Sequence, residues 1–164
     1  ISISYLNKQI EAGIDVAMIF DTWGSLLNDE QYEKFSLRYI NKIKHSISNQ
    51  DIPLIYYVRE TDKKLEALKS LDIDVLGIDS TTEIGVIKKQ IGDKFALQGN
   101  LDVNILKKDE KDIIIEIKKI LTSYGSNSGH VFNLGTGITP DINPDKVKIL
   151  IDNLADISSK INVK

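Results

Sequence analysis

Polar residues follow each of five short apolar runs in the sequence, at the positions where parallel strands of an α/β protein end. Asp21 and Thr22 follow the first run, and Thr136 lies between two glycines after the last one. Together with neighbouring aromatic residues and glycines, the set at the ends of these runs comprises Phe20, Asp21, Thr22, Trp23, Arg59, Glu60, Asp79, Ser80, Gln98, Asn100, Gly135, Thr136 and Gly137. Their side chains could bind or orient a polar ligand, since ligands bind beyond the carboxyl ends of such strands. Each could instead serve only as a helix cap or a turn residue, which is common for Asp, Asn, Ser and Thr.

Several other kinds of chemistry are excluded or disfavoured by the residues that the sequence contains. It has no cysteine, which excludes disulfides, thiolate metal ligands and a cysteine nucleophile. It has two histidines, of which His45 is expected on a solvated helix face and His130 as a structural residue that opens a strand, so we predict no metal site. The segment GTGITP at residues 135–140 lacks the third glycine of a dinucleotide fingerprint and the Lys–Ser/Thr pair of a P-loop.

The charge pattern is that of an ordinary globular protein without a nucleic-acid or membrane surface. The 164 residues carry a formal net charge of -3, with charges of both signs interspersed, and the pI is about 5.4. No apolar run approaches the ~20 residues that span a bilayer, and the first residues do not resemble a signal peptide. We therefore expect a cytoplasmic protein that binds neither nucleic acid nor membrane. The chain begins without methionine inside an amphipathic pattern, which indicates a fragment of a longer protein.

Strands and helices are expected to alternate along the whole chain. Apolar, β-branched runs predict strands at residues 14–20, 53–58, 73–78, 94–99 and 130–135, and apolar positions three or four apart predict helices at 29–47, 63–70, 82–90, 109–121 and 144–157. Asn143 and Pro144 have the residue types of an N-cap and a first helical position. This alternation predicts a parallel sheet with right-handed crossovers. Two closures fit it: an open doubly wound sheet, or an arc of a (β/α)₈ barrel.

Four stretches carry a resemblance to a known family. They read AGIDVAMIFDTWGSLL, LGIDSTTEI, ALQGNLDVNIL and GHVFNLGTGITPDINPDKVKILID. In order and spacing, from Tyr5 to about Ser159, they resemble the C-terminal half of the uroporphyrinogen decarboxylases. The resemblance implies a single α/β segment over residues 1–164, which is the C-terminal half of a (β/α)₈ barrel with about five parallel strands and without its N-terminal half.

The resemblance also implies an activity and a set of contact residues. The family removes four acetate carboxyls from uroporphyrinogen III, without a cofactor, to give coproporphyrinogen III in haem biosynthesis. Its arginines, which hold the substrate carboxylates and donate a proton, and its essential aspartate belong to the missing half, so this chain is expected to supply no catalytic residue. A substrate-contacting Ser/Thr falls on Thr22, with Phe20 and Asp21 on the same wall, and a substrate-contacting histidine falls on Thr136. We expect the turn around residue 136 to depend on Gly135 and Gly137.

Three departures from the family pattern leave other functions open. Thr136 replaces the histidine, RETDKK at residues 59–64 replaces a glycine-rich turn, and Ser80 replaces a tryptophan. A catalytically degenerate fragment or a non-enzymatic α/β binding module is therefore the alternative. A related zinc-thiolate methyltransferase is disfavoured by the absence of cysteine. We expect the isolated chain to be inactive, and to form a homo-oligomer or to pair with the N-terminal half, because a half-barrel has open edges.

Overall fold

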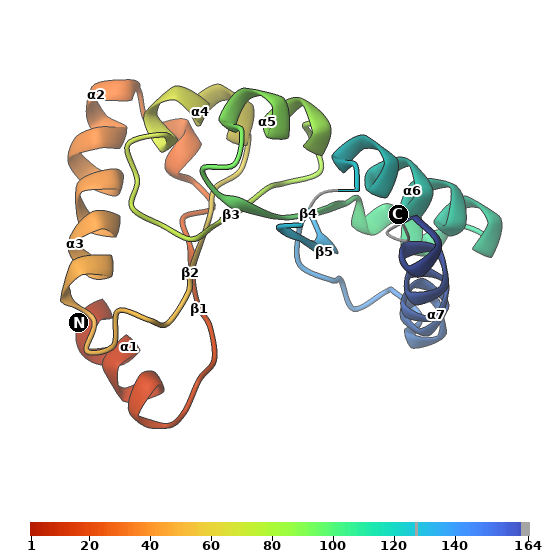
Figure 1. Cartoon of the computed structure of the whole chain (residues 1–164), viewed down its shortest axis with the longest axis horizontal. Helices are drawn as coiled ribbons and strands as arrows, with labels where there is room; N and C mark the ends of the chain where they lie inside the picture. The colour runs from red at the N-terminus through yellow and green to blue at the C-terminus, as the bar shows by residue number, and fades with distance from the viewer. Residues whose placement is uncertain (127, 162–164) are drawn as a thin grey trace.

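The computed structural model describes residues 1–126 and 128–161 as alternating helices and strands (Figure 1). The helices are α1 (Ser2–Glu11), α2 (Asp29–Tyr32), α3 (Arg38–Ser46), α4 (Thr61–Leu68), α5 (Ile84–Ile91), α6 (Glu110–Tyr124) and α7 (Pro144–Ile161). The strands are β1 (Ala17–Phe20), β2 (Leu54–Tyr57), β3 (Val75–Gly77), β4 (Ala96–Leu101) and β5 (His130–Leu134). A π-helical turn, η2 (Glu33–Leu37), joins α2 to α3, and 3₁₀ turns η1 (Gly24–Leu26) and η3 (Val103–Lys107) follow β1 and β4. None of the helices within these described residues is long and apolar enough to cross a membrane.

The five strands form one parallel sheet in the order of the sequence, β1-β2-β3-β4-β5. Phe20 is in register with Tyr57, Tyr57 with Gly77, Gly77 with Gln98, and Gln98 with Val131. A doubly wound sheet would place late strands on both sides of the first one. The observed order therefore excludes that closure and confirms the prediction of a barrel arc.

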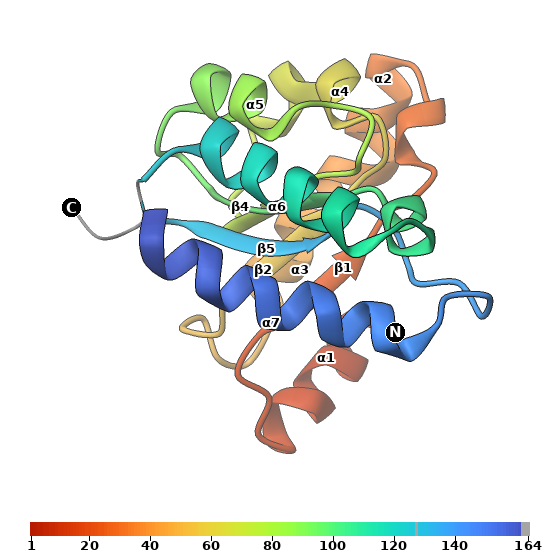
Figure 2. The same ribbon diagram turned by 90° about the vertical axis from the view of Figure 1, so that its right-hand side faces the viewer.

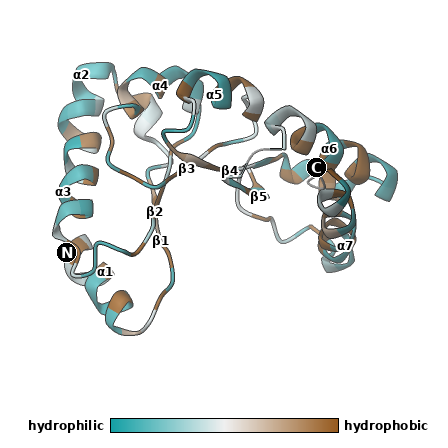
Figure 3. Cartoon of the chain, viewed as in Figure 1, coloured by the Kyte–Doolittle hydropathy of each residue, from teal (hydrophilic) through white to brown (hydrophobic). Residues whose placement is uncertain are grey.

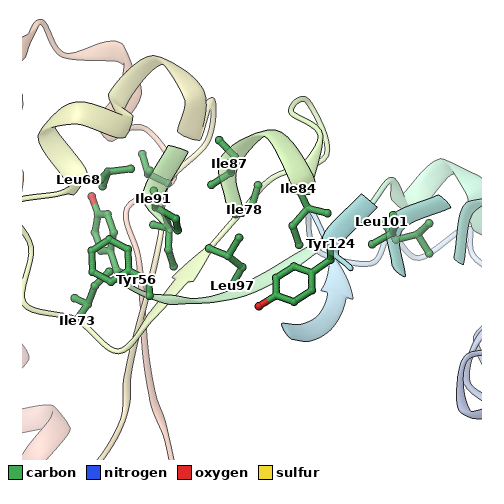
Figure 4. Close-up of a cluster of buried hydrophobic side chains, with 14 of the residues drawn as sticks. Tyr56, Leu68, Ile73, Ile78, Ile84, Ile87, Ile91, Leu97, Leu101 and Tyr124 are labelled. Atoms are coloured by element: carbon green, nitrogen blue, oxygen red, sulfur yellow. The ribbon is translucent and has the colours of Figure 1, made fainter. Parts of the chain in front are cut away.

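Helices cover the outer face of this sheet and bury its hydrophobic side chains. In Figure 1 they lie in an arc around the strands, and α7 packs against α6 (Figure 2). The longer helices, such as α6 and α7, contain both hydrophobic and hydrophilic residues (Figure 3). Leu68 of α4 and Ile87 of α5 point toward Tyr56 and Leu97 of the sheet, and all four are 0% exposed (Figure 4). Each such aliphatic side chain contributes about 1.5–3 kcal/mol of hydrophobic stabilisation.

The inner face of the sheet is not covered by any helix of the described chain (Figure 1). Because side chains alternate along a strand, this face carries Met18, Phe20, Tyr57, Gln98 and Val131. Phe20 is 68% exposed and Val131 is 46% exposed, which is unusual for strand residues of this type. The outer edges of β1 and β5 also carry no neighbouring strand within the described residues. Helices therefore cover the outer face of the sheet, whereas no helix of the described residues covers its inner face.

The boundaries of some elements differ from those expected from the sequence. The first strand begins at Ala17 rather than at residue 14, because Ile14 packs against the core without joining the sheet. The helix expected at 29–47 contains the π-helical turn η2, in which the Ser36 hydroxyl donates a hydrogen bond to the Asp21 carboxylate. The cap expected at Asn143 is confirmed, since its Oδ1 accepts the Asp145 amide proton over an N–O distance of 2.9 Å.

Candidate functional site

A cavity of about 530 Å³ lies on the inner face, toward the carboxyl ends of the strands. It contains three of the four residues expected to contact substrate, namely Phe20, Thr22 and Thr136. The full lining is Met18, Phe20, Thr22, Tyr57, Arg59, Gly77, Ile78, Gln98, Asn133, Leu134, Gly135, Thr136, Gly137 and Ile138. Residues from the turns after β1 and β5, at opposite edges of the sheet, therefore meet in one concave site. Its aromatic walls and its hydroxyl and amide groups suit a large ligand with polar substituents.

The turn that presents Thr136 is fixed by a tyrosine on the second strand. The Tyr57 hydroxyl donates a hydrogen bond of 2.9 Å to the carbonyl oxygen of Gly135. A Cβ atom at Gly135 would collide with the backbone nitrogen of Ser80, so this position requires glycine. A Cβ at Gly137 would meet nothing within 4 Å, and its φ is not positive. The expectation that the turn depends on both glycines is therefore wrong for Gly137, where no close approach or left-handed conformation excludes a side chain.

The Tyr57 phenol also lies in a distinct electrostatic setting. Its pKa is raised, first by burial and then by the charge of Asp79, whereas the positive charge of Arg59 acts in the opposite direction. The hydroxyl therefore keeps its proton and serves as a hydrogen-bond donor to the turn. This hydrogen bond joins Tyr57 of β2 to the Gly135 turn on the wall of the cavity.

Asp21, the fourth expected contact residue, is not part of the cavity lining. Its Oδ2 accepts a hydrogen bond of 2.8 Å from the Tyr56 hydroxyl and another from the Ser36 hydroxyl. The Tyr56 hydroxyl is also 2.8 Å from that of Tyr32, and burial is the main reason why the pKa of each tyrosine is raised. A Cβ at Gly24 would collide with the Asp21 carboxylate. Asp21 therefore ties the turn after β1 to η2 and β2, and its contact with a substrate remains a prediction.

The remaining rim residues belong to other surroundings. Ser80 and Asn100 line a second cavity of about 380 Å³ between the loops after β3 and β4 and the helices α5 and α6. The Asn100 side chain donates hydrogen bonds to the carbonyl oxygens of Asp79, over 3.0 Å, and of Thr82. Asp79 is 1% exposed and its Oδ2 accepts a hydrogen bond of 2.9 Å from Thr81. The rim is therefore split, and only its β1, β2 and β5 parts converge on the main cavity together with Gln98.

Both histidines have the structural roles expected of them. His45 is exposed on α3, 3.4 Å from a carboxylate oxygen of Asp72. His130 stacks on Tyr124 with ring centroids 4.5 Å apart, its Nε2 lies 2.9 Å from the Gly99 carbonyl oxygen, and burial lowers its pKa. In the described part of the chain, no three His, Asp or Glu side chains are grouped so that they could hold a metal ion.

The polar cavity residues that the sequence argument did not select as contacts are Tyr57, Arg59, Gln98 and Asn133. Arg59 follows β2, and its guanidinium carbon lies 5.2 Å from the ring centroid of Trp23. Alternation along strand 53–58 places residues 55, 57 and 59 on one side, and this signal could have identified Tyr57 and Arg59. It was hidden because the strand is apolar on both faces.

Comparison with known proteins places this geometry in a fold and then in a family. The chain superimposes on a methyltransferase from Methanosarcina mazei with a TM-score of 0.82 and 23% identity, covering 95% of this chain and 46% of that one. This likeness concerns the fold alone, and the five consecutive parallel strands are those of the C-terminal half of a (β/α)₈ barrel. Residues 1–156 match the family model for uroporphyrinogen decarboxylase (URO-D), and the chain belongs to that family.

Curated relatives agree with this assignment and show how much of the family the chain represents. It is 45% identical over 152 residues to the uroporphyrinogen decarboxylase of Tolumonas auensis and 43% identical over 164 residues to that of Ruthia magnifica. The alignments cover 90% and 98% of this chain but 43% and 47% of the relatives. The chain thus spans less than half the length of the relatives that it matches.

Proposed function

We propose that this chain forms one wall of the substrate site of a uroporphyrinogen decarboxylase. The reaction is the loss of carbon dioxide from the four acetate side chains of uroporphyrinogen III, which gives coproporphyrinogen III in haem biosynthesis, a cytoplasmic pathway. The observation that carries the proposal is the convergence of Thr22 and Thr136 on one cavity, in a chain that matches the decarboxylase family model over residues 1–156.

The chemistry of the wall suits recognition of the macrocycle rather than the decarboxylation step itself. Phe20 and Tyr57 offer apolar surface to the pyrrole rings, and their own rings lie 5.8 Å apart. The hydroxyls of Thr22 and Thr136 can donate hydrogen bonds to substrate carboxylates. No cofactor enters this proposal. The group that protonates the pyrrole carbon before carbon dioxide leaves would come from the other half of the barrel.

The open inner face and free strand edges support a complementary half-barrel as the partner. The exposed inner face would form the interior of a closed barrel, and the free edges of β1 and β5 could pair with two further strands. We propose that the chain functions with an N-terminal half of the same family, on the same polypeptide or on a separate one. A homo-oligomer of the chain, which would also cover the face, is the competing assembly.

Mass and activity measurements test this proposal together. Native mass spectrometry of the purified protein would identify a complementary half or a second copy beside the 18.4 kDa chain. We expect coproporphyrinogen formation only when the complementary half is present, and Thr22→Val should lower kcat/KM about ten-fold by removing a hydrogen-bond donor. Thr122→Val on the exposed surface of α6 is the matched control and should leave kcat/KM unchanged. If the wild-type protein, Thr22→Val and Thr122→Val are equally active, the assignment of Thr22 as a substrate contact is contradicted.

A degenerate binding module is the second candidate, and one observation favours it. Thr136 stands where the family resemblance expects a histidine, and a hydroxyl provides neither a positive charge nor a group that titrates near neutral pH. This candidate predicts that the assembled protein binds uroporphyrin but releases no carbon dioxide. Detectable turnover by the assembly would exclude it.

A further inference from the structure

Arg59 is the only charged residue among the fourteen that line the main cavity. It enters the site directly after β2, beside Tyr57, and shares the lining with Thr22 and Thr136. The rest of the lining is apolar, hydroxyl, amide or glycine. A guanidinium in such surroundings can donate charge-assisted hydrogen bonds to an anionic ligand.

The guanidinium has no counter-ion among residues 1–126 and 128–161. No carboxylate in this described part lies within 4.0 Å of it. The adjacent acid, Glu60, instead forms an ion pair with Lys63 over 2.8 Å. The backbone of Glu60 is in the left-handed conformation, with φ 50°. A half-buried arginine without an acidic partner retains its full hydrogen-bonding capacity for a ligand.

Trp23 provides a support that orients this side chain. Its ring lies 5.2 Å from the guanidinium carbon, within the range of a cation–π contact, and it belongs to the turn that also carries Thr22. A guanidinium held against an aromatic ring can still direct its donors toward a carboxylate and bind it in a bidentate manner.

We propose that Arg59, oriented by Trp23, binds a carboxylate of the ligand in this cavity and provides the positive charge that Thr136 cannot. The ligand class is a polycarboxylate, and its identification as the tetrapyrrole rests on the proposed function. Residues 59–64 depart from the family's glycine-rich turn, and in this proposal the departure supplies Arg59 as the positive charge of the site. Recognition of the ligand carboxylate is therefore retained.

The first arm of the test concerns the arginine alone. Arg38 and Arg59 are the only arginines of the chain, and Arg38 is exposed on α3, with its guanidinium carbon 5.8 Å from the ring centroid of Tyr39. We would label the arginines of this chain with ¹⁵N, in the assembly in which it purifies, and add succinate at constant ionic strength. The Arg59 Nε–H signal should shift and saturate while that of Arg38 does not. Absence of a shift, or equal shifts of both signals, would overturn the proposal.

The second arm uses uroporphyrin III, the stable oxidised form of the proposed substrate, with fluorescence as the readout. Arg59→Gln should weaken binding roughly ten- to hundred-fold, Arg59→Lys less, and Arg38→Gln not at all. If uroporphyrin binds the wild-type protein and Arg59→Gln equally well, the role of Arg59 is wrong while the proposed function stands. If succinate shifts Arg59 but uroporphyrin does not bind, the carboxylate site stands and the proposed function falls.

Discussion

Tyr56 and Tyr57 are adjacent in β2, and their side chains leave the sheet on opposite faces. Tyr56 is 0% exposed under the helices, with its hydroxyl hydrogen-bonded to Tyr32 and Asp21 over 2.8 Å each. Tyr57 lines the inner cavity, and its hydroxyl donates to the Gly135 carbonyl oxygen. The same residue type thus completes a structural cluster on one face and holds a site-forming turn on the other.

This difference extends over the whole sheet. On the outer face, the helices bury hydrophobic side chains such as Leu97, and the Asp21 carboxylate is hydrogen-bonded to Tyr56 and Ser36. On the inner face, Phe20 and Val131 are exposed and Arg59 lacks an acidic partner in the described residues. The outer face therefore specifies the fold of this half-barrel, whereas the inner face is shaped for groups that the chain itself does not provide.

Two phenylalanines give the strongest test of the contrast between the faces. Phe95 is 3% exposed in the outer core, and Phe95→Ala should lower the free energy of unfolding by about 3–5 kcal/mol. Phe20→Ala, which removes the same side chain from a position that is 68% exposed, should cost less than about 1 kcal/mol. Urea denaturation of the purified protein measures both. Equal losses would mean that the inner face is covered in solution, as it would be in a homo-oligomer.

The adjacent tyrosines provide the second test. Tyr56→Phe removes a donor to the Asp21 carboxylate and a partner of Tyr32, and should destabilise the protein by about 2–3 kcal/mol. Tyr57→Phe loses one hydrogen bond to a backbone carbonyl and should cost about 1 kcal/mol. Thermal or urea unfolding compares the two variants directly, and a larger effect at Tyr57 would contradict the structural assignment of the outer cluster.

The same cluster predicts how stability depends on pH. Burial raises the pKa of Tyr32 and of Tyr56 in the folded state above the value of about 10 for an unfolded chain. Above that pH the unfolded chain loses protons that the folded chain keeps, so stability is fully present below pH ~10 and is lost as pH rises further. Replacement of both tyrosines by phenylalanine should make the decline in urea midpoint between pH 9 and 11 less steep.

Substitutions of the two glycines in the turn after β5 test the geometry of the inner face at single positions. Gly135→Ala brings a Cβ against the Ser80 backbone and should cost about 2 kcal/mol of stability, together with affinity for a cavity ligand. Gly137→Ala meets no atom within 4 Å and should change stability by less than about 0.5 kcal/mol. Similar effects of the two substitutions would show that the turn adopts a different conformation in solution.

The order and direction of the strands could be predicted because their signals are local. Five β-branched runs separated by helical periodicity leave few topologies for a parallel sheet, and the family resemblance selects the barrel arc. The π-helical turn at Glu33–Leu37 could not be predicted, because it depends on the contact between Ser36 and Asp21, which lie fifteen residues apart. The early start assigned to the first strand has a similar cause, since Ile14 is apolar for packing rather than for strand pairing.

The candidate site was predictable by position but not by orientation. Phe20, Thr22 and Thr136 lie in the cavity because they end or follow strands that end on the same rim. Asp21 follows the same strand, yet its side chain joins the outer cluster because adjacent residues of an extended chain point in opposite directions. The sequence places Arg59 on the rim, but its proposed role depends on the Trp23 contact and on the pairing of Glu60 with Lys63. Neither contact can be predicted from the sequence alone.

The smallest expected effect on stability, and the most specific for function, is that of Thr136→His. The Gly135 turn is held by Tyr57 and by the fit against Ser80, so the side chain at 136 should change unfolding free energy by less than about 0.5 kcal/mol. If the assembled protein carries out the proposed reaction, a charge-assisted hydrogen bond from the imidazole should exceed that of a hydroxyl by about 1–2 kcal/mol, or roughly ten-fold in kcat/KM. The gain should fade as pH rises past the imidazole pKa of about 6.5, which Arg59 in the same cavity lowers and bound carboxylates raise. Adding Arg59→Gln to Thr136→His should therefore raise the imidazole pKa, so that the gain in kcat/KM persists to higher pH. Unchanged turnover and affinity from pH 6 to 8 would mean that residue 136 does not face the substrate.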